Sequence, residues 1–246
     1  MRLGTRGSPL AIIQTQELRD RILAAHPGLD VEIVTVKTTF AAQVLILLFG
    51  TPTAWFLATR RFPGRSVLVT LVELPFVLPP AVAGIGLLVA FGRFGLLGKH
   101  LGIWEHLSFN WLAVTFAAML VASPLYVRQA IAAFQAIDDN VVAASRTLGA
   151  GPARTFFRVA LPLASGGLAA GLALCIARSI GEFGATIMFA GSLQGRTQTL
   201  TLAVYQEFDS DFDTALAISA LLVIVSVAIL LALKLSALWH PSRQTS

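Results

Sequence analysis

Apolar residues gather in long runs that make up most of the chain. The runs lie at about residues 40–59, 67–91, 111–133, 161–190 and 214–238. About 20 helical residues cross the hydrocarbon core of a membrane, so each run is long enough to span it. The pattern therefore predicts an all-α membrane protein with about five transmembrane helices.

The first 38 residues follow a different pattern. Residues 1–6 predict a short strand, and Ser8-Pro9 predicts the start of a helix with a capping residue followed by proline. Residues 31–36 alternate between apolar and polar side chains, which is typical of a half-buried strand. We therefore expect a short soluble β-α-β fragment over 1–38, a transmembrane domain over 39–240 and a tail over 241–246.

Two of the apolar runs contain residues that do not suit a plain membrane helix. Pro75, Pro79 and Pro80 must break or kink the second run, which places it beside a pathway rather than against lipid. Arg178 and Glu182 lie four residues apart in the fourth run, so they can pair on one helix face. Because intramembrane charges usually face a bundle interior or a watery cavity, the pair fits either a gate or a structural salt bridge.

A polar, basic segment over 143–162 separates the third and fourth runs. Its three arginines cannot sit in lipid, Gly149 and Gly151 permit a sharp bend, and Pro152 suits the first turn of a helix. The segment predicts a helix, a turn and a second short helix at the membrane surface.

Composition and charge support a membrane protein and suggest its orientation. Hydrophobic residues make up 56% and charged residues 13% of the 246 residues, against about 25% charged residues in soluble domains. If the turn with Arg60, Arg61 and Arg65 is cytoplasmic, the 143–162 segment and the C-terminal tail lie on the same side. The lone Cys175 and the scattered histidines predict neither a disulfide framework nor a metal site.

The 143–162 segment resembles the Glu-Ala-Ala loop in the membrane subunits of bacterial importers driven by ATP-binding cassettes. That loop has the pattern Glu-Ala-Ala, three residues, Gly, nine residues, Ile, one residue, Leu-Pro. Its slots are filled here, with alanine in place of the glutamate, by Ala143, Ala144, Ser145, Gly149, Val159, Leu161 and Pro162. The resemblance implies that these residues couple the chain to an ATPase, and the alternative is an ordinary basic loop between two helices.

Further strings narrow the resemblance to the membrane subunits of molybdate importers. They are Arg-Phe-Pro-Gly-Arg at 61–65, Leu-Pro-Phe-Val-Leu-Pro-Pro at 74–80, Ala-Arg-Ser-Ile-Gly-Glu-Phe-Gly-Ala-Thr at 177–186 and Gly-Arg-Thr-Gln-Thr-Leu at 195–200. Sulfate and thiosulfate permeases share Gly-Glu-Phe-Gly, so sulfate, thiosulfate and tungstate stay open as alternative solutes. The resemblance covers residues 36 to about 240.

The resemblance implies a permease of the MetI-like fold, built as a homodimer in the bacterial cytoplasmic (inner) membrane with its C-terminus in the cytoplasm. Two cytoplasmic ATP-binding cassette subunits would bind the ATP, and an extracytoplasmic protein would deliver the oxyanion. The permease itself would be no enzyme, carry no cofactor and bind no nucleic acid. Passage of an oxyanion would favour backbone N–H groups and hydroxyls such as Ser123 and Thr186, and Ser123-Pro124 is another candidate helix break.

The first 39 residues resemble a second family, porphobilinogen deaminase (hydroxymethylbilane synthase). Arg6 and Ser8 fall in its Thr-Arg-x-Ser motif, which lines the cleft for a dipyrromethane cofactor. This resemblance implies a fusion or chimera whose deaminase-like part is vestigial, with hydroxymethylbilane synthesis as a remote alternative function.

Overall fold

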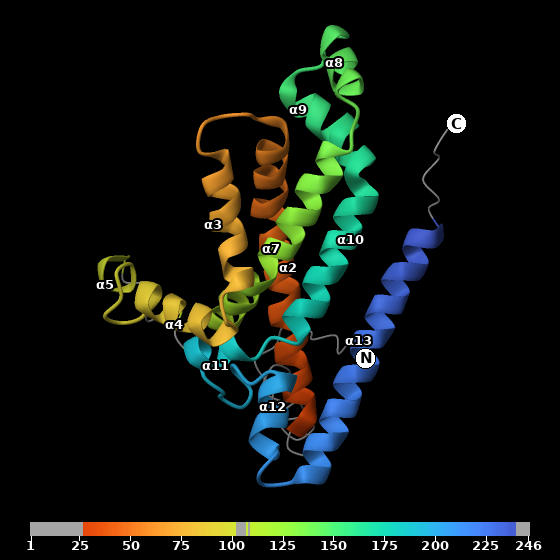
Figure 1. Cartoon of the computed structure of the whole chain (residues 1–246). Helices are drawn as coiled ribbons and strands as arrows, with labels where there is room; N and C mark the ends of the chain where they lie inside the picture. Colours follow the sequence, from red (N-terminus) through yellow and green to blue (C-terminus); the bar gives the residue numbers. More distant parts are fainter. Residues whose placement is uncertain (1–26, 102–106, 108, 240–246) are drawn as a thin grey trace, which may run out of the picture.

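Helices form all of the regular structure in the residues that the structure describes. The computed structural model describes residues 27–101, 107 and 109–239. Its long helices run along one axis of the molecule, and they are α2 (Pro27–Thr59), α7 (Trp111–Gln135), α10 (Leu161–Ile180) and α13 (Phe212–Trp239) (Figure 1). The all-α prediction is confirmed.

Helix α7 lies at the centre of this bundle and packs against α2 and α10. Small residues let the helices approach closely, as is common in membrane bundles. A Cβ atom added to Gly167 of α10 would lie 2.5 Å from the Cβ atom of Ala133 on α7. Tyr126 of α7 is fully buried, and its hydroxyl lies 2.7 Å from the Thr51 hydroxyl of α2. Helices α2, α7 and α10 thus form one packed core.

The second apolar run folds as two helices, α3 (Arg65–Val77) and α4 (Pro80–Phe91), that meet at an angle of 115°. The predicted break lies at Pro79 and Pro80, which cap and start α4, because proline lacks an N–H and disfavours helix in the residue before it. Pro75 stays inside α3. Helix α3 packs against α7, while α4 and α5 (Gly98–Leu101) leave to one side in Figure 1.

The fourth apolar run is also interrupted, so the expectation of one span over 161–190 is wrong beyond Ile180. Helix α10 ends there, and α11 (Gly184–Ala190) begins after a short break. The reason is tertiary packing of α11 on α4. A Cβ atom added to Gly84 would lie 2.6 Å from the Ala185 oxygen, and one added to Gly184 would lie 3.0 Å from the Pro80 Cβ atom.

The length and composition of the described helices set the number of candidate membrane spans. Three stretches qualify, and the bent pair α3–α4 would make a fourth. They are Val34–Thr59, Trp111–Gln135 and Pro152–Ile180. In α13, the stretch Phe212–Ala228 is a shorter apolar helix, and α12 (Leu200–Glu207) packs beside it.

Two local predictions are wrong. Residues 31–36 belong to α2 and not to a strand, and α2 continues without a break past residue 39. The Thr35 hydroxyl accepts a hydrogen bond from the Leu200 N–H of α12 at 3.0 Å, so this part of α2 is built into the bundle. Likewise, α7 runs unbroken through Ser123-Pro124, with Pro124 buried, because neighbouring helices can support proline within a membrane helix.

Candidate functional site

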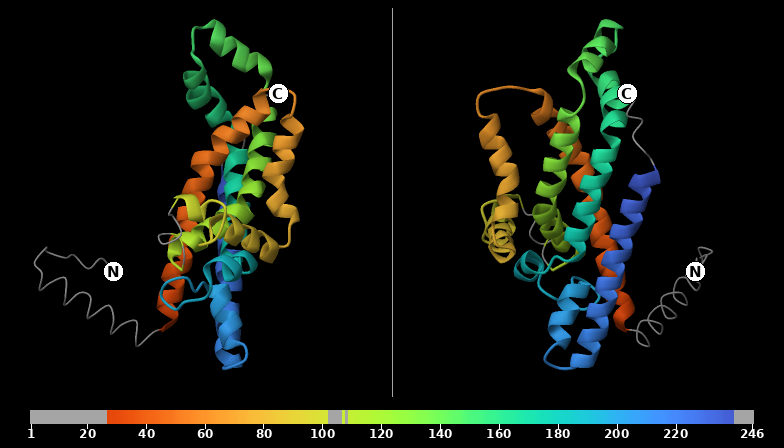
Figure 2. Two further views of the ribbon diagram at one scale, coloured as in Figure 1. Left: turned by 90° about the vertical axis from the view of Figure 1, so that its left-hand side faces the viewer. Right: turned by 45° about the vertical axis from the view of Figure 1, so that its right-hand side comes forward.

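The 143–162 segment forms a hairpin at one end of the bundle, consisting of α8 (Asp139–Thr147), α9 (Pro152–Thr155) and the short π-helix η1 (Phe156–Ala160). We call it the α8–α9 hairpin. Figures 1 and 2 show it projecting beyond the long helices. Asp138 caps α8 by accepting a hydrogen bond from the Asn140 N–H at 2.9 Å, and Pro152 starts α9. The predicted helix, turn and short helix are confirmed.

The turn of the hairpin depends on Gly149. Its φ angle is +84°, a left-handed conformation that glycine adopts without steric cost. Gly151 has an ordinary φ of −67° and acts as the N-cap of α9. Only Gly149 therefore needs to be glycine for conformational reasons.

Side-chain contacts hold the two arms of the hairpin together and connect its base to the bundle. The hydroxyls of Ser145 on α8 and Thr155 on α9 lie 3.1 Å apart, and Thr155 is fully buried. Below them, the Phe156 ring packs 5.6 Å from the Trp55 ring of α2 and 6.2 Å from the Phe134 ring of α7. These contacts connect α8 to α9, and η1 to α2 and α7.

The predicted coupling residues divide between the tip and the base of this hairpin. Ala143, Ala144 and Gly149 are exposed at the tip, and Ser145 is half-buried against α9. Half-buried Val159 and Leu161 and exposed Pro162 lie where η1 passes into α10. The turn over 148–151 separates the two groups, and α9, η1 and α10 follow one another without a gap from Pro152 onward.

At the other end of α10, Glu182 organises the break before α11. Its Oε2 atom lies 2.8 Å from the Nη1 atom of Arg178, so the predicted ion pair forms even though Glu182 lies beyond the helix end. Its Oε1 atom accepts a hydrogen bond from the Ala185 N–H at 2.8 Å, and its backbone oxygen accepts one from the Thr201 hydroxyl at 2.7 Å. With 2% of its side chain exposed, Glu182 connects α10, α11 and α12.

Apart from Glu182 Oε2, which pairs with Arg178, two buried polar atoms near this break have no hydrogen-bond partner among the described residues. They are the Thr186 hydroxyl on α11 and the Oε1 atom of Gln43 on α2, whose Nε2 atom donates to the Ser179 hydroxyl at 2.9 Å. Unpartnered buried polar atoms are uncommon and suit a site that a polar solute can visit. Ser123 is not part of this group, since its hydroxyl donates to the Leu120 oxygen of its own helix.

The hairpin and the break are linked by packed helices. Helix α10 runs from η1 to Glu182, Glu182 caps α11, and α11 packs on α4 at Gly84 and Gly184. Pro80 starts α4 and also lies against Gly184 of α11, so the bend of the second apolar run is located at the α4–α11 contact. The hairpin and the α4–α11 contact are thus connected through α10 and the short break over 181–183, in which Glu182 is held by its contacts.

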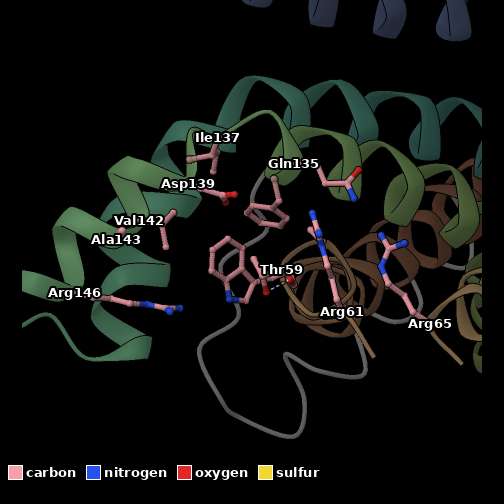
Figure 3. Close-up of a pocket in the computed structure, with 12 residues that line it drawn as sticks. Thr59, Arg61, Arg65, Gln135, Ile137, Asp139, Val142, Ala143 and Arg146 are labelled. Atoms are coloured by element: carbon pink, nitrogen blue, oxygen red, sulfur yellow. Dashed lines mark hydrogen bonds between the residues drawn. The ribbon is translucent and has the colours of Figure 1, made fainter. Parts of the chain in front are cut away.

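The sequence analysis missed a cavity at the base of the hairpin. It has a volume of about 690 Å³ and lies between α8 and the ends of α2 and α7 (Figure 3). Arg61, Arg65 and Arg146 line it together with Asp139. Positive charge in each segment was visible in the sequence, but only the fold brings these arginines together.

Other polar groups lie elsewhere. At the end opposite the hairpin, Asp211 caps α13, and hydrogen bonds from Thr214 hold the pKa of Asp211 below its ordinary value. The described residues contain no cluster of His, Cys, Asp and Glu that could hold a metal ion. Arg6 and Ser8 lie outside the described residues.

A bundle with broken helices and a projecting basic hairpin defines a polytopic membrane protein of the permease class. The family model described as "Binding-protein-dependent transport system inner membrane component" matches residues 50–242, and the chain belongs to this family.

Relatives and a solved structure agree with this assignment. The chain is 43% identical over 180 residues to the molybdenum transport system permease protein ModB of Haemophilus influenzae, covering 71% of this chain and 79% of that protein. It is 46% identical over 206 residues to the ModB of Mycobacterium tuberculosis, covering 81% and 76%. The inward-facing MetNI methionine ABC transporter shares the fold, with a TM-score of 0.67, 19% identity, and coverage of 86% of this chain and 97% of that chain.

These comparisons give no support to the predicted fusion with a porphobilinogen deaminase. The family match begins at residue 50, and the relatives reported above are permease proteins, which are transport components and not enzymes.

Proposed function

We propose that this chain is the membrane-spanning subunit of an ATP-driven importer for molybdate. The observation that carries the proposal is its identity of 43% and 46% to two molybdenum permease proteins, each matched over more than two thirds of both chains. Sulfate, thiosulfate and tungstate are the alternative solutes, since they are also tetrahedral oxyanions.

The proposed mechanism uses the two ends of α10. A cytoplasmic ATPase binds the exposed tip of the α8–α9 hairpin, and closure of the ATPase moves the hairpin as one body. Helix α10 then shifts Glu182, and the α4–α11 contact opens or closes the path. Such coupled rigid-body movement is a known type of two-state switch. The unpartnered Thr186 hydroxyl lies where it could donate to a passing oxyanion.

The proposal includes the partners and the orientation. Two copies of the chain form the pore, two ATP-binding cassette subunits bind and hydrolyse the ATP, and an extracytoplasmic protein delivers the oxyanion. The hairpin end carries the basic turn over 60–65, and the opposite end carries the acidic segment 207–213. By the positive-inside rule the hairpin and the C-terminus face the cytoplasm. A transmembrane domain over 39–240, which α2 enters without a break from Pro27, and a tail over 241–246 remain part of this proposal.

Uptake of radiolabelled molybdate into cells that lack their own permease tests the proposed solute. The chain should restore uptake when it is expressed with its ATPase and binding protein. Excess unlabelled molybdate should abolish the signal, whereas equal sulfate should leave most of it. Uptake that sulfate or tungstate suppresses at lower concentration than molybdate would assign the alternative solute.

Labelling of a single cysteine tests the orientation. An Ala144→Cys variant places a thiol on the exposed tip of the hairpin, while the protein's own Cys175 is fully buried. A membrane-impermeant maleimide should label this thiol in inside-out vesicles and not in intact cells. Labelling of intact cells would place the hairpin outside and contradict the coupling role.

A further inference from the structure

The cavity at the base of the hairpin has the charge of an anion site. Arg61, Arg65 and Arg146 line it with one carboxylate, that of Asp139, which leaves an excess of two positive charges. None of the three arginines forms an ion pair with a described carboxylate; the ion pairs present are Arg128–Glu73 and Arg178–Glu182. Guanidinium groups bind phosphate oxygens well because they offer several N–H donors in a fixed plane.

One of these arginines is held in place by the helix that it follows. The Nε atom of Arg65 donates to the Leu57 oxygen at 2.7 Å, which satisfies a backbone oxygen near the C-terminus of α2. The two terminal nitrogens of Arg65 stay available to bind an anion. In Figure 3, Arg61 and Arg65 lie on the α2 side of the cavity, and Arg146 reaches toward it from α8.

The rest of the lining is mostly apolar, and its two uncharged polar residues mark the ends of candidate membrane spans. Thr59 and Gln135 are the last residues of two candidate membrane spans, and both line the cavity. Apolar side chains complete the wall, and they are Trp55, Ala58, Phe134, Ile137, Val142 and Ala143. Aromatic and basic residues at span ends are typical of contact with headgroups. A cavity of about 690 Å³ exceeds the needs of a small inorganic ion.

The cavity uses one face of α8, which includes Ala143, and leaves the other predicted coupling residues at the tip, Ala144 and Gly149, free for the ATPase. Asp139, Val142, Ala143 and Arg146 follow the spacing of a single helix face. The exposed residues Val141, Ala144, Thr147 and Leu148 lie elsewhere around α8 and at its end. An occupant can therefore enter from the membrane side without displacing a protein bound to the outer surface of the hairpin.

We propose that this cavity binds the phosphate headgroup of an anionic phospholipid from the cytoplasmic leaflet. The arginines bind the phosphate oxygens, and the apolar wall receives the first carbons of the acyl chains. Basic pockets between membrane helices on the cytoplasmic side are suited to anionic headgroups. The lipid would lie between α8 and the ends of α2 and α7, so it supports the hairpin from beneath. The site differs from the proposed solute path, which lies at the far end of α10.

Native mass spectrometry of the purified full-length chain in neutral detergent tests the proposal, with dioctanoyl phosphatidylglycerol as the probe. We expect one lipid to bind per chain more tightly than dioctanoyl phosphatidylcholine. Arg61→Gln and Arg146→Gln should each weaken binding by about fivefold, and the double variant by about 25-fold, since one basic residue near a membrane surface contributes about 1 kcal/mol. Arg61→Lys should retain most of the affinity because the charge stays.

Arg154→Gln is the matched control. It removes one exposed arginine from the same hairpin without touching the cavity, and its phosphatidylglycerol affinity should equal that of the unchanged chain. Equal weakening in this control would show that overall charge, and not the cavity, attracts the lipid. Equal affinity for phosphatidylcholine would also overturn the proposal.

Two competition arms separate the lipid from other anions. Inorganic phosphate and molybdate should fail to displace the bound phosphatidylglycerol, since they lack acyl chains; displacement by either would assign the cavity to a free oxyanion. The assembled complex with its ATPase should keep the lipid. Loss of the lipid on assembly would assign the cavity to an acidic segment of the ATPase and refute the lipid site.

Discussion

The ion pair between Arg178 and Glu182 allows a prediction with a clear asymmetry. The two side chains are 29% and 2% exposed, and their charged atoms lie 2.8 Å apart. Removing one partner of a buried ion pair costs about 3–5 kcal/mol, because the remaining charge has lost its compensation. The cost depends on which charge is left, since the Arg178 side chain is partly exposed and the Glu182 side chain is buried.

Three variants test this asymmetry. Arg178→Met leaves a buried carboxylate, so the free energy of unfolding should fall by about 3–5 kcal/mol. Glu182→Gln leaves a partly exposed guanidinium and keeps an oxygen for the Ala185 N–H, so the loss should be only about 1–2 kcal/mol. The double variant removes both charges and should lose less than Arg178→Met alone.

Equilibrium unfolding in detergent, with solute uptake measured on the same variants, tests this reasoning. Strictly additive losses in the double variant would refute it, because charges that do not interact give additive effects. The uptake data separate two roles. A structural salt bridge predicts that uptake returns with stability in the double variant, whereas a gate predicts that uptake stays low.

Other substitutions test single contacts. Gly149→Ala should lower stability by about 1 kcal/mol through its φ of +84°, since no atom lies within 4 Å of the added Cβ, while Gly151→Ala should cost less in the same unfolding assay. Gly84→Ala should cost about 1–3 kcal/mol in thermal unfolding because its Cβ meets the backbone of α11, and Gly86→Ala, which meets nothing, is the control. Thr155→Val should loosen the hairpin and increase proteolysis between α8 and α9. Unchanged cleavage would contradict a stabilising role for the hydrogen bond between Ser145 and Thr155.

The helices were largely predictable because the membrane imposes a simple length rule. Runs of about 20 apolar residues must be helical to cross, and the starts and ends of α7 and α13 lie within about two residues of the predicted limits. The break at Pro79 and Pro80 followed from the missing N–H of proline.

Elements that depend on tertiary contacts were not predictable in this way. The alternation over 31–36 suits a strand locally, but the segment is the start of α2 and packs on α12 through Thr35. The end of α10 at Ile180 depends on Glu182, which caps α11, and on Gly184, which packs against Pro80. No periodicity in the run over 161–190 marks either contact.

The candidate site was predicted only in part, because some of its contacts also depend on the tertiary fold. The hairpin and the Arg178–Glu182 pair are local in sequence, and both form as predicted. The arginine-lined cavity joins a turn after α2 with a helix after α7, and a single sequence does not show which distant arginines meet. The unpartnered Thr186 hydroxyl was named only as one of several possible hydroxyls, and burial distinguishes it.

The central claim is that the α8–α9 hairpin carries the movement of the ATPase to the break at Glu182. Sealed vesicles that contain this chain, its ATPase and its binding protein allow molybdate uptake and ATP hydrolysis to be measured together. Gly149→Asp should reduce the molybdate imported per ATP hydrolysed, while Gly151→Asp, which adds the same charge at an N-cap position that accepts aspartate, should preserve it. An unchanged ratio in Gly149→Asp would contradict the account.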